Sequence, residues 1–375
     1  MNRPPFCPHR HCAAHHNPPP GRWWQRRGYY TTALNGLVPR FRCTVCGFGF
    51  SAQTFSIDYY AKRRVDYRSL VWLLIGCMGV RQMARYLKVS YGTVENKTMR
   101  FARQALAVQA ELIDRLPLTE SVCADGLQSF WVSQYVPNNI TVLAGSESRF
   151  LYWWNGASLR RGGRMTEKQK ARREELEQAY RADPAALKYA FYDICEALCR
   201  LVTESDQPHT ILDTDCHKAY ADALAKHGVW LGLKQAGRVT HRTTSSQEPR
   251  TQFNPLAPVN VIDRQIRTDL AEHVRETVRF ARNPNRSMER FCVWAYAYNY
   301  CKRFRINQPV ADGRTHAQVA GIAPRRVQEA QRGVYSRRRF LSHTPLLDRM
   351  REIWLRMLDR PFAVKDEYLP KYLLA

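Results

Sequence analysis

The sequence predicts an α/β protein with a mixed β-sheet, preceded by a cysteine-bearing ribbon and a small helical unit. Three observations predict it. Two pairs of cysteines stand near the N-terminus, helical periodicity follows in residues 69–106, and from residue 121 short apolar strands alternate with helices. The chain has 375 residues, enough for two or three domains, and its 45% hydrophobic content suffices for a buried core.

The chain is strongly basic. Lys and Arg number 58 against 33 Asp and Glu, so the formal net charge is +25. Residues 1–120 carry +12, residues 121–299 carry +4 and residues 300–375 carry +9, and residues 323–375 predict a basic C-terminal tail. Such a surface attracts a polyanion, usually DNA or RNA. A highly soluble protein from an Arg-rich proteome is the alternative, but the motifs below favour nucleic acid.

Two classes of protein are excluded by the apolar pattern. No run of about 18 uncharged apolar residues occurs, so we expect no membrane span. No apolar stretch of a secretory signal follows the N-terminus. The chain has 11 cysteines, and an odd number without a signal favours a reducing cytoplasm over a disulfide framework.

The two cysteine pairs predict a structural zinc site within residues 1–60. Cys7 and Cys12 form one pair, and Cys43 and Cys46 form the other. The segment between them can form a small β-ribbon, and its aromatic and basic residues suit contact with DNA. Four protein thiolates leave no open coordination position, so the zinc would be structural. Nearby histidines as ligands, or chance clustering of reduced thiols, are the alternatives.

Residues 61–118 predict a helix-turn-helix. An apolar run at 69–78, a second helix at 80–87 and a third helix from residue 91 are separated by a glycine and a short turn. The last two helices would offer polar side chains to a DNA groove. These are Arg81, Tyr91, Thr93, Asn96, Lys97 and Arg100. An ordinary three-helix packing unit is the alternative.

Residues 119–322 predict the sheet domain. We expect two insertions in it: a charged arm near 155–183 and a loop near 235–260, where Arg242 is a candidate phosphate contact. The expected strands are 121–124, 140–144, 150–154, 209–215 and 229–233, and the expected helices lie near 185–204, 217–227 and 284–301. This is the order of an RNase H-like sheet: three strands, followed by helix, strand, helix, strand and helix.

Three carboxylates are candidates for a divalent-metal site. In that architecture the ends of the first and fourth strands lie side by side, which would bring Asp125 to Asp215. Glu289 lies on the apolar face of the last helix, where an acid is unusual without a positive partner. Two Mg²⁺ ions (or Mn²⁺) about 4 Å apart would be that partner, and they would activate water or a 3′-hydroxyl for displacement at phosphorus.

Short motifs stand in a characteristic order along the chain. They are the four ribbon cysteines with Arg42, Gly47 and Phe50-Ser51, the helices at 80–100, Asp125 with Gln128, Thr214-Asp215 with Tyr220, Arg275-Glu276-Thr277, Asn283, Met288-Glu289-Arg290, Asn299-Tyr300 and residues 315–322. Together they resemble bacterial insertion-sequence transposases of the DDE type with an N-terminal zinc ribbon. The resemblance extends from about residue 7 to residue 322.

The resemblance implies a function. It implies an RNase H-like catalytic domain that uses a divalent metal to cleave and join DNA strands at the ends of its own element. By position, it implies Asp125, Asp215 and Glu289 as the catalytic, metal-binding acids. It also implies double-stranded DNA as the partner, a homo-oligomer on that DNA, and a bacterial, cytoplasmic, nucleoid-associated protein.

Several assignments stay open at this stage. Asp213 competes with Asp215 as the second acid, and Glu272 and Glu276 compete with Glu289 as the third. Two other functions also remain. One is a zinc-ribbon and helix-turn-helix DNA-binding regulator derived from an inactive transposase, and the other is a structure-specific nuclease of the same fold.

Overall fold

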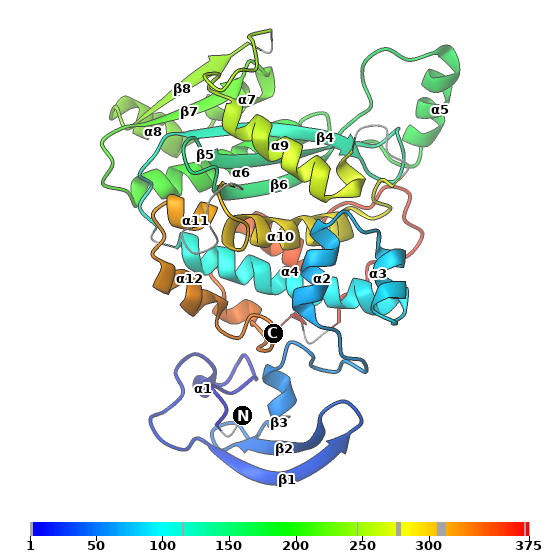
Figure 1. The fold of residues 1–375 in the computed structure, drawn as a ribbon, viewed down its shortest axis with the longest axis vertical. Coiled ribbons are helices and arrows are strands. Elements are labelled where there is room, and N and C mark those ends of the chain that lie inside the picture. The colour runs from blue at the N-terminus through cyan, green and yellow to red at the C-terminus, as the bar shows by residue number, and fades with distance from the viewer. Residues whose placement is uncertain are drawn as a thin grey trace.

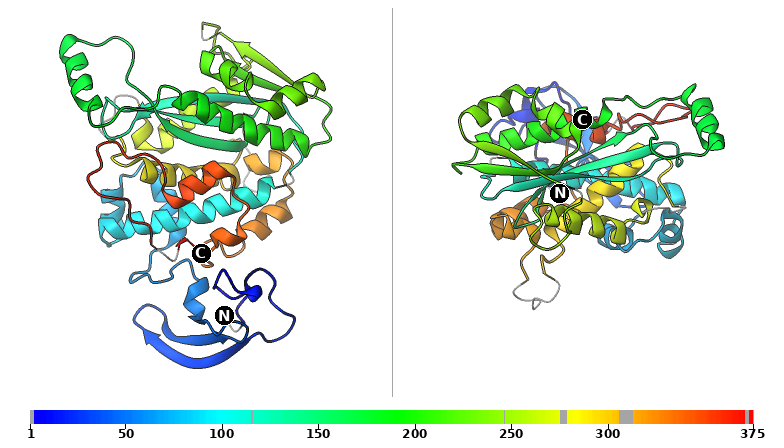
Figure 2. Two further views of the ribbon diagram at one scale, coloured as in Figure 1. Left: turned by 180° about the vertical axis from the view of Figure 1, so that it is seen from behind. Right: turned by 90° about the horizontal axis from the view of Figure 1, so that it is seen from above.

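Figure 1 presents the computed structural model, which describes residues 3–114, 116–245, 247–274, 279–305, 313–370 and 373–374. A small N-terminal unit lies below a larger body, in which helices cover both faces of a five-stranded sheet (Figures 1 and 2). The predicted α/β class with a mixed sheet is therefore confirmed.

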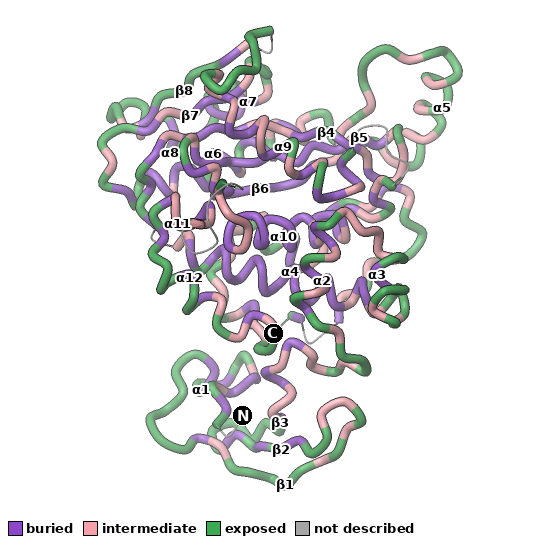
Figure 3. The backbone as a smooth tube through the Cα atoms, viewed as in Figure 1, coloured by how far each residue is buried: buried purple, intermediate pink, exposed green. Residues whose placement is uncertain are grey.

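The N-terminal unit is an antiparallel ribbon of three strands. They are β1 (Trp24–Thr32), β2 (Gly36–Cys43) and β3 (Gly49–Ser51), with the short helices α1 (Ala13–His16) and η1 (Ala52–Phe55) beside them. Its core is a cluster of aromatic rings and cysteines that includes Trp23, Phe41 and Phe50. Most of the ribbon strands stay exposed (Figure 3), so this small core has little apolar area to stabilise it.

The C-terminal segment completes the ribbon unit and does not form the tail that the sequence predicted. Phe340 is buried in the aromatic cluster of the ribbon. The Ile57 N–H donates to the Ser336 carbonyl (3.0 Å), and the Arg338 N–H donates to the Phe55 carbonyl (2.8 Å). The basic composition of residues 323–375 suggested solvent exposure, but its scattered apolar residues pack against the rest of the chain.

The three helices expected after the ribbon are present. They are α2 (Tyr67–Ile75), α3 (Val80–Tyr86) and α4 (Tyr91–Ile113). The Asp66 side chain caps α2, and the Ser90 hydroxyl caps α4 by accepting from the Thr93 N–H (3.2 Å). Lys88 has φ +52° in the turn between α3 and α4, a left-handed conformation for which glycine is usual. The first turn of α4 and Glu111 near its end reach the surface, while most of the residues between them are buried (Figure 3).

The central sheet has the strand order β6-β5-β4-β7-β8. Its strands are β4 (Val122–Phe130), β5 (Pro137–Gly145), β6 (Leu151–Ser158), β7 (Thr210–Asp215) and β8 (Val239–Thr244). The first three pair antiparallel, and β7 and β8 run parallel to β4 and to each other. Strand β4, the first of this sheet along the chain, is therefore central, and β7, the fourth, lies beside it.

Helices pack on both faces of the sheet. The Trp153 indole N–H donates to Asp193 of α6 (Ala186–Thr203, 2.8 Å), while the neighbouring Trp154 contacts Phe291 of α10 (Pro284–Tyr300). Because successive residues of a strand point to opposite faces, α6 and α10 lie on opposite sides. Figure 2 shows the same division, with α9 on the side of α10. The remaining helices are α7 (Lys218–Leu224), α8 (Gly228–Gln235), α9 (Ala257–Asp269), η2 (Ala271–His273), α11 (His316–Val319), α12 (Pro324–Gln331), η3 (Leu341–His343) and α13 (Asp348–Leu355).

The fifth strand lies later in the chain than the sequence predicted. Residues 229–233 form helix α8, whose first turn is capped by the His227 ring accepting from the Trp230 N–H (3.2 Å). The strand is β8, inside the segment expected to be a loop at 235–260. A short apolar run is compatible with either element, and here the His cap favours the helix.

The first strand is longer than predicted and continues through Asp125. Gly126 follows Asp125 and suggested a turn, but it lies within β4. A Cβ on Gly126 would stand 2.2 Å from the Asn139 side chain, so the glycine permits a close approach of β5.

The charged arm forms as predicted, although it begins later than expected because β6 extends to Ser158. Helix α5 (Glu167–Glu177) has a capping box between Thr166 and Gln169 and no buried residue, and it projects from the body in Figure 1. On its surface Arg173 pairs with Glu177 at 3.6 Å, and Lys170 pairs with Glu167. Among the residues described, none of the helices is long and apolar enough to cross a membrane.

Candidate functional site

The pairing of β4 with β7 brings two of the predicted acids together. Cys123 lies opposite Asp213 in this parallel pair. Asp125 and Asp215 each follow two residues later, so they project from the same face of neighbouring strands. Burial raises the pKa of Asp125, and the negative charge of Asp215 adds to this shift, as expected from the placement.

The ionised carboxylate of Asp125 is electrostatically destabilised. Burial, followed by the charge of Asp215, raises its pKa from 3.8 to about 6. Three groups oppose this shift: the Gly126 N–H, which donates to the carboxylate at 2.7 Å, and the positive charges of Arg250 and His217. Two acids held together in this way favour a cation between them.

A third carboxylate belongs to the same neighbourhood, and it is not Glu289. Tyr220 of α7 is buried, and its pKa is raised well above the usual value by that burial and then by the charges of Asp125, Asp215 and Asp263. Three acids from β4, β7 and α9 therefore act electrostatically on one tyrosine. Asp263 thus becomes a candidate for the third acid in place of Glu289.

Asp213 has a different partner from Asp215. Its two carboxylate oxygens accept from the Arg242 guanidinium of β8 at 2.5 and 2.9 Å. Arg242 was predicted to contact phosphate, but here it ties β8 to β7 through this pair. Asp215, and not Asp213, is among the charges that raise the pKa of Asp125, which favours Asp215 as the second acid.

The structure does not bring Glu289 to the two aspartates. Glu289 is 1% exposed and lies between Arg103 of α4 and Arg356, which donates to both carboxylate oxygens at 2.7 and 2.8 Å. These two arginines hold the pKa of Glu289 below its usual range against the opposing effect of burial. The positive partner expected for this buried acid is thus a pair of arginines.

The competing acids for the third position also lie elsewhere. Glu272 pairs with Arg290 and accepts from the Ser287 hydroxyl at 2.9 Å. Glu276, with the rest of the Arg275-Glu276-Thr277 motif, lies outside the described residues.

Sequence reasoning missed Asp263 because it misplaced the fifth strand. Helix α9 follows β8 directly, has proline at its start, and buries Val259, Ile262 and Ile266 against the sheet. An acid beside that apolar stripe was visible in the sequence, but the segment had been assigned partly to a loop.

The three acids have the ligand chemistry of a divalent-cation site, but they do not form a compact one. Carboxylate oxygens are the ligands that Mg²⁺ and Mn²⁺ prefer in proteins. Among the described residues, the groups close enough to hold a metal ion are the four ribbon cysteines and the set of His15, His16 and His343. A cation at Asp125, Asp215 and Asp263 would therefore have to draw these side chains closer together.

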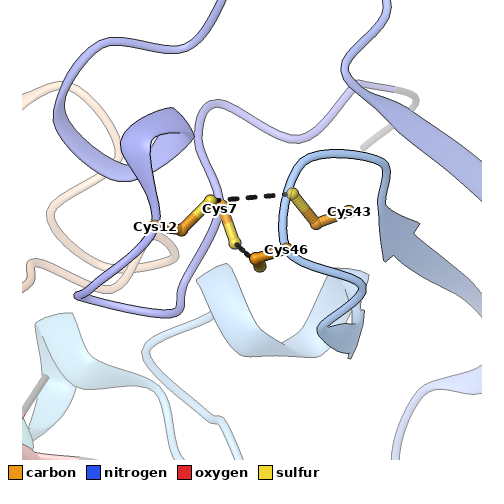
Figure 4. Close-up of side chains that lie close together, drawn as sticks. All are labelled: Cys7, Cys12, Cys43 and Cys46. Atoms are coloured by element: carbon orange, nitrogen blue, oxygen red, sulfur yellow. Dashed lines mark hydrogen bonds between the residues drawn. The ribbon is translucent and has the colours of Figure 1, made fainter.

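The four ribbon cysteines form a compact group able to bind a metal (Figure 4). Cys7 Sγ lies 3.7 Å from Cys46 Sγ, and Cys12 Sγ lies 3.8 Å from Cys43 Sγ. A tetrahedron with Zn–S bonds of about 2.3 Å has edges of about 3.8 Å, so these separations fit zinc.

A second group of possible ligands, His15, His16 and His343, lies where the ribbon meets the body. Both ring nitrogens of His15 are already in hydrogen bonds, to the Cys7 carbonyl (2.6 Å) and to the Ser342 hydroxyl (2.7 Å). This group therefore helps to dock the ribbon.

The predicted DNA-contacting residues fall into two groups. Arg81 and Tyr91 are exposed, and Thr93 is half-buried beside a surface hollow of about 550 Å³. Lys97 and Arg100 are buried: Lys97 pairs with Asp58, and Arg100 donates to the Ile57 carbonyl and to the Asn96 side chain (2.6 and 2.7 Å). Their expected role in a DNA groove does not agree with this burial, since they anchor α4 to the segment that leaves the ribbon.

The chain matches no protein-family model and no curated protein. Its chemistry must therefore be inferred from its own residues.

We predict that replacing Cys43 and Cys46 together by serine lowers the zinc content from about one ion per chain to nearly none, because the ribbon loses half of its ligands. Metal analysis of the purified protein measures this. The control is Cys216→Ser, which removes an exposed cysteine outside the group. Equal zinc in all three proteins would contradict the assignment.

We predict that Asp125→Asn raises the melting temperature at pH 8 in buffer without added magnesium. The folded state binds the Asp125 proton more tightly than the unfolded state, so the ionised carboxylate destabilises the fold above pH 6. The gain should fade as the pH falls to about 4, where the carboxyl is protonated in both states. Asp206→Asn, at an exposed site, should show no such trend. A lower melting temperature for Asp125→Asn at pH 8 would refute the prediction.

We predict that Glu289→Gln destabilises the protein by about 3 kcal/mol, because it leaves buried Arg103 without its charged partner. Denaturant unfolding measures the change. Glu329→Gln breaks the exposed pair with Arg325 and should cost less than about 1 kcal/mol. Similar values for the two variants would argue against a structural role for the buried pair.

Proposed function

We propose that this protein is a metal-dependent DNA transposase, which cleaves and joins DNA strands at the ends of an insertion sequence. The observation that carries the proposal is the group of three acids around Tyr220, contributed by the two central parallel strands and by the helix after the last strand. Hydrolysis and transesterification at phosphorus both use such a carboxylate site with a divalent ion.

The strand order supports an RNase H-like catalytic domain. Three antiparallel strands are followed by two parallel ones, and the first strand takes the centre. In this order, β4 and β7 each contribute an aspartate to one site. The same arrangement was expected from the sequence, with Asp263 now proposed as the third acid in place of Glu289.

The residues at this site would have different roles. Asp125, Asp215 and Asp263 would hold Mg²⁺ or Mn²⁺, which when bound activates the attacking oxygen and stabilises the leaving oxygen. Tyr220 stays protonated at neutral pH, and its ring stacks on Phe191 of α6 with the centroids 4.1 Å apart. Arg250 lies close enough to lower the pKa of Asp125, so its positive charge is available to a DNA phosphate beside the site.

The proposed reaction has two steps, hydrolysis and strand transfer. A water oxygen forms a bond to phosphorus and a strand oxygen leaves, which frees a 3′-hydroxyl. That hydroxyl then forms a bond to a phosphorus of the target, and the target strand oxygen leaves.

The proposed partner is double-stranded DNA. The net charge of +25 supports binding to a polyanion, and the exposed Arg81 and Tyr91 at the starts of α3 and α4 are accessible to DNA. Since an element has two ends and one chain has one such group of acids, we also propose that two or more copies act together on DNA.

We predict that Asp125→Asn, Asp215→Asn and Asp263→Asn each lower metal-dependent nicking of supercoiled plasmid by at least about 100-fold, because each removes a metal ligand. Agarose gels with added Mg²⁺ or Mn²⁺ measure nicking. Asp206→Asn is the matched control, as an exposed aspartate outside the site.

Glu289→Gln separates the two candidates for the third acid. Below its melting temperature it should keep most of the nicking activity, while Asp263→Asn should not. Loss of activity in folded Glu289→Gln with full activity in Asp263→Asn would reverse the assignment.

A joining assay then distinguishes a transposase from a nuclease. A plasmid carrying the repeats that flank the gene should give joined products with a second DNA. Cleavage without joining would favour a structure-specific nuclease, and neither activity would favour a DNA-binding regulator.

A further inference from the structure

The ribbon carries a basic hollow that the catalytic proposal does not use. It has a volume of about 970 Å³ and lies between the ribbon strands and the segments that dock the ribbon on the body. It is remote in the fold from the sheet that carries Asp125, since Figure 1 shows the helical layer of α2, α4 and α12 between the ribbon and that sheet.

The charged side chains that line the hollow are all positive. Arg27, Arg40 and Arg42 come from neighbouring strands of the ribbon and are exposed, and Arg338 enters from the C-terminal segment. No aspartate or glutamate is found among the described residues that line the hollow. A ligand that fits it therefore carries several negative charges.

Aromatic rings lie among these arginines. Tyr60 is 70% exposed and Phe48 is 43% exposed, although both are large and partly apolar. Tyr59 lies against Tyr60 with the ring centroids 4.2 Å apart. Exposed ring faces beside guanidinium groups suit a ligand that alternates phosphates with flat rings.

We propose that this hollow binds single-stranded DNA, with phosphates on Arg40 and Arg42 and an unpaired base on Tyr60. A duplex exposes its phosphates but keeps its bases stacked inside, so it cannot use the rings. Binding of a single strand in the hollow does not depend on the proposed transposase function. Only the choice of DNA over RNA as that strand rests on the proposed function.

Fluorescence anisotropy with a labelled oligonucleotide tests the proposal on the zinc-loaded full chain. We use a single-stranded 15-mer, its duplex and the RNA of the same sequence over a range of salt concentrations. Arg40→Ala/Arg42→Ala should weaken single-strand binding about tenfold or more and reduce the salt slope by about 1.4, since two phosphate contacts are lost. Tyr60→Ala should weaken it about tenfold with no change in slope.

Matched variants of the same ribbon act as controls. Arg22→Ala/Arg26→Ala removes the same charge from exposed positions outside the hollow, and Tyr29→Ala removes an exposed ring outside it. Both should bind the single strand within about twofold of the native chain. Zinc content and melting temperature are measured for every variant, so that loss of folding is not read as loss of binding.

The outcomes separate the alternatives. Weaker single-strand binding with unchanged duplex binding supports the proposal. Equal weakening for both DNA forms, no weakening, the same effect in the control variants, or tighter binding to RNA overturns it. Asp125→Asn should bind the single strand like the native chain, so failure of the cleavage proposal leaves this result interpretable.

Discussion

The parallel pairing of β4 with β7 is the constraint on which the proposed site depends. It places Asp125 and Asp215 on the same face of adjacent strands, where burial and then the charge of Asp215 raise the pKa of Asp125. Folding alone does not favour such an arrangement, because the burial of like charges is costly. The strand pairing nevertheless holds Asp125 beside Asp215, and acids with perturbed pKa values are frequent at functional sites.

A second set of buried charges has the opposite character. Arg103, Glu289 and Arg356 are nearly excluded from solvent, and together they connect α4, α10 and the C-terminal segment. Here the charges are matched, so the pKa of Glu289 is lowered, whereas that of Asp125 is raised. The direction of each shift distinguishes an acid that stabilises the fold from one that requires a further partner.

Much of the fold could be predicted from local patterns, and the failures have physical causes. The cysteine pairs, the capped helices and the order of the strands are short-range signals. The fifth strand was misplaced because residues 229–233 are apolar enough for either element, and this error hid Asp263. Glu289 was expected to need a positive partner, but that partner was expected to be Mg²⁺. The arginines that pair with it lie 186 and 67 residues away in the chain, beyond any spacing rule. Lys97 and Arg100 were predicted to contact DNA for the same reason. Their actual partners, Asp58 and the Ile57 carbonyl, lie about forty residues earlier in the chain, in the segment before α2.

Phe340 makes the ribbon depend on a distant part of the chain. All four cysteines precede residue 60, yet the aromatic core beside them takes one ring from residue 340. The backbone bonds to Ser336 and Arg338 come from the same distant segment. Local unfolding around residue 340 would therefore remove a ring and two backbone bonds from the ribbon unit. The stability of the N-terminal unit is thus coupled to the folding of the body.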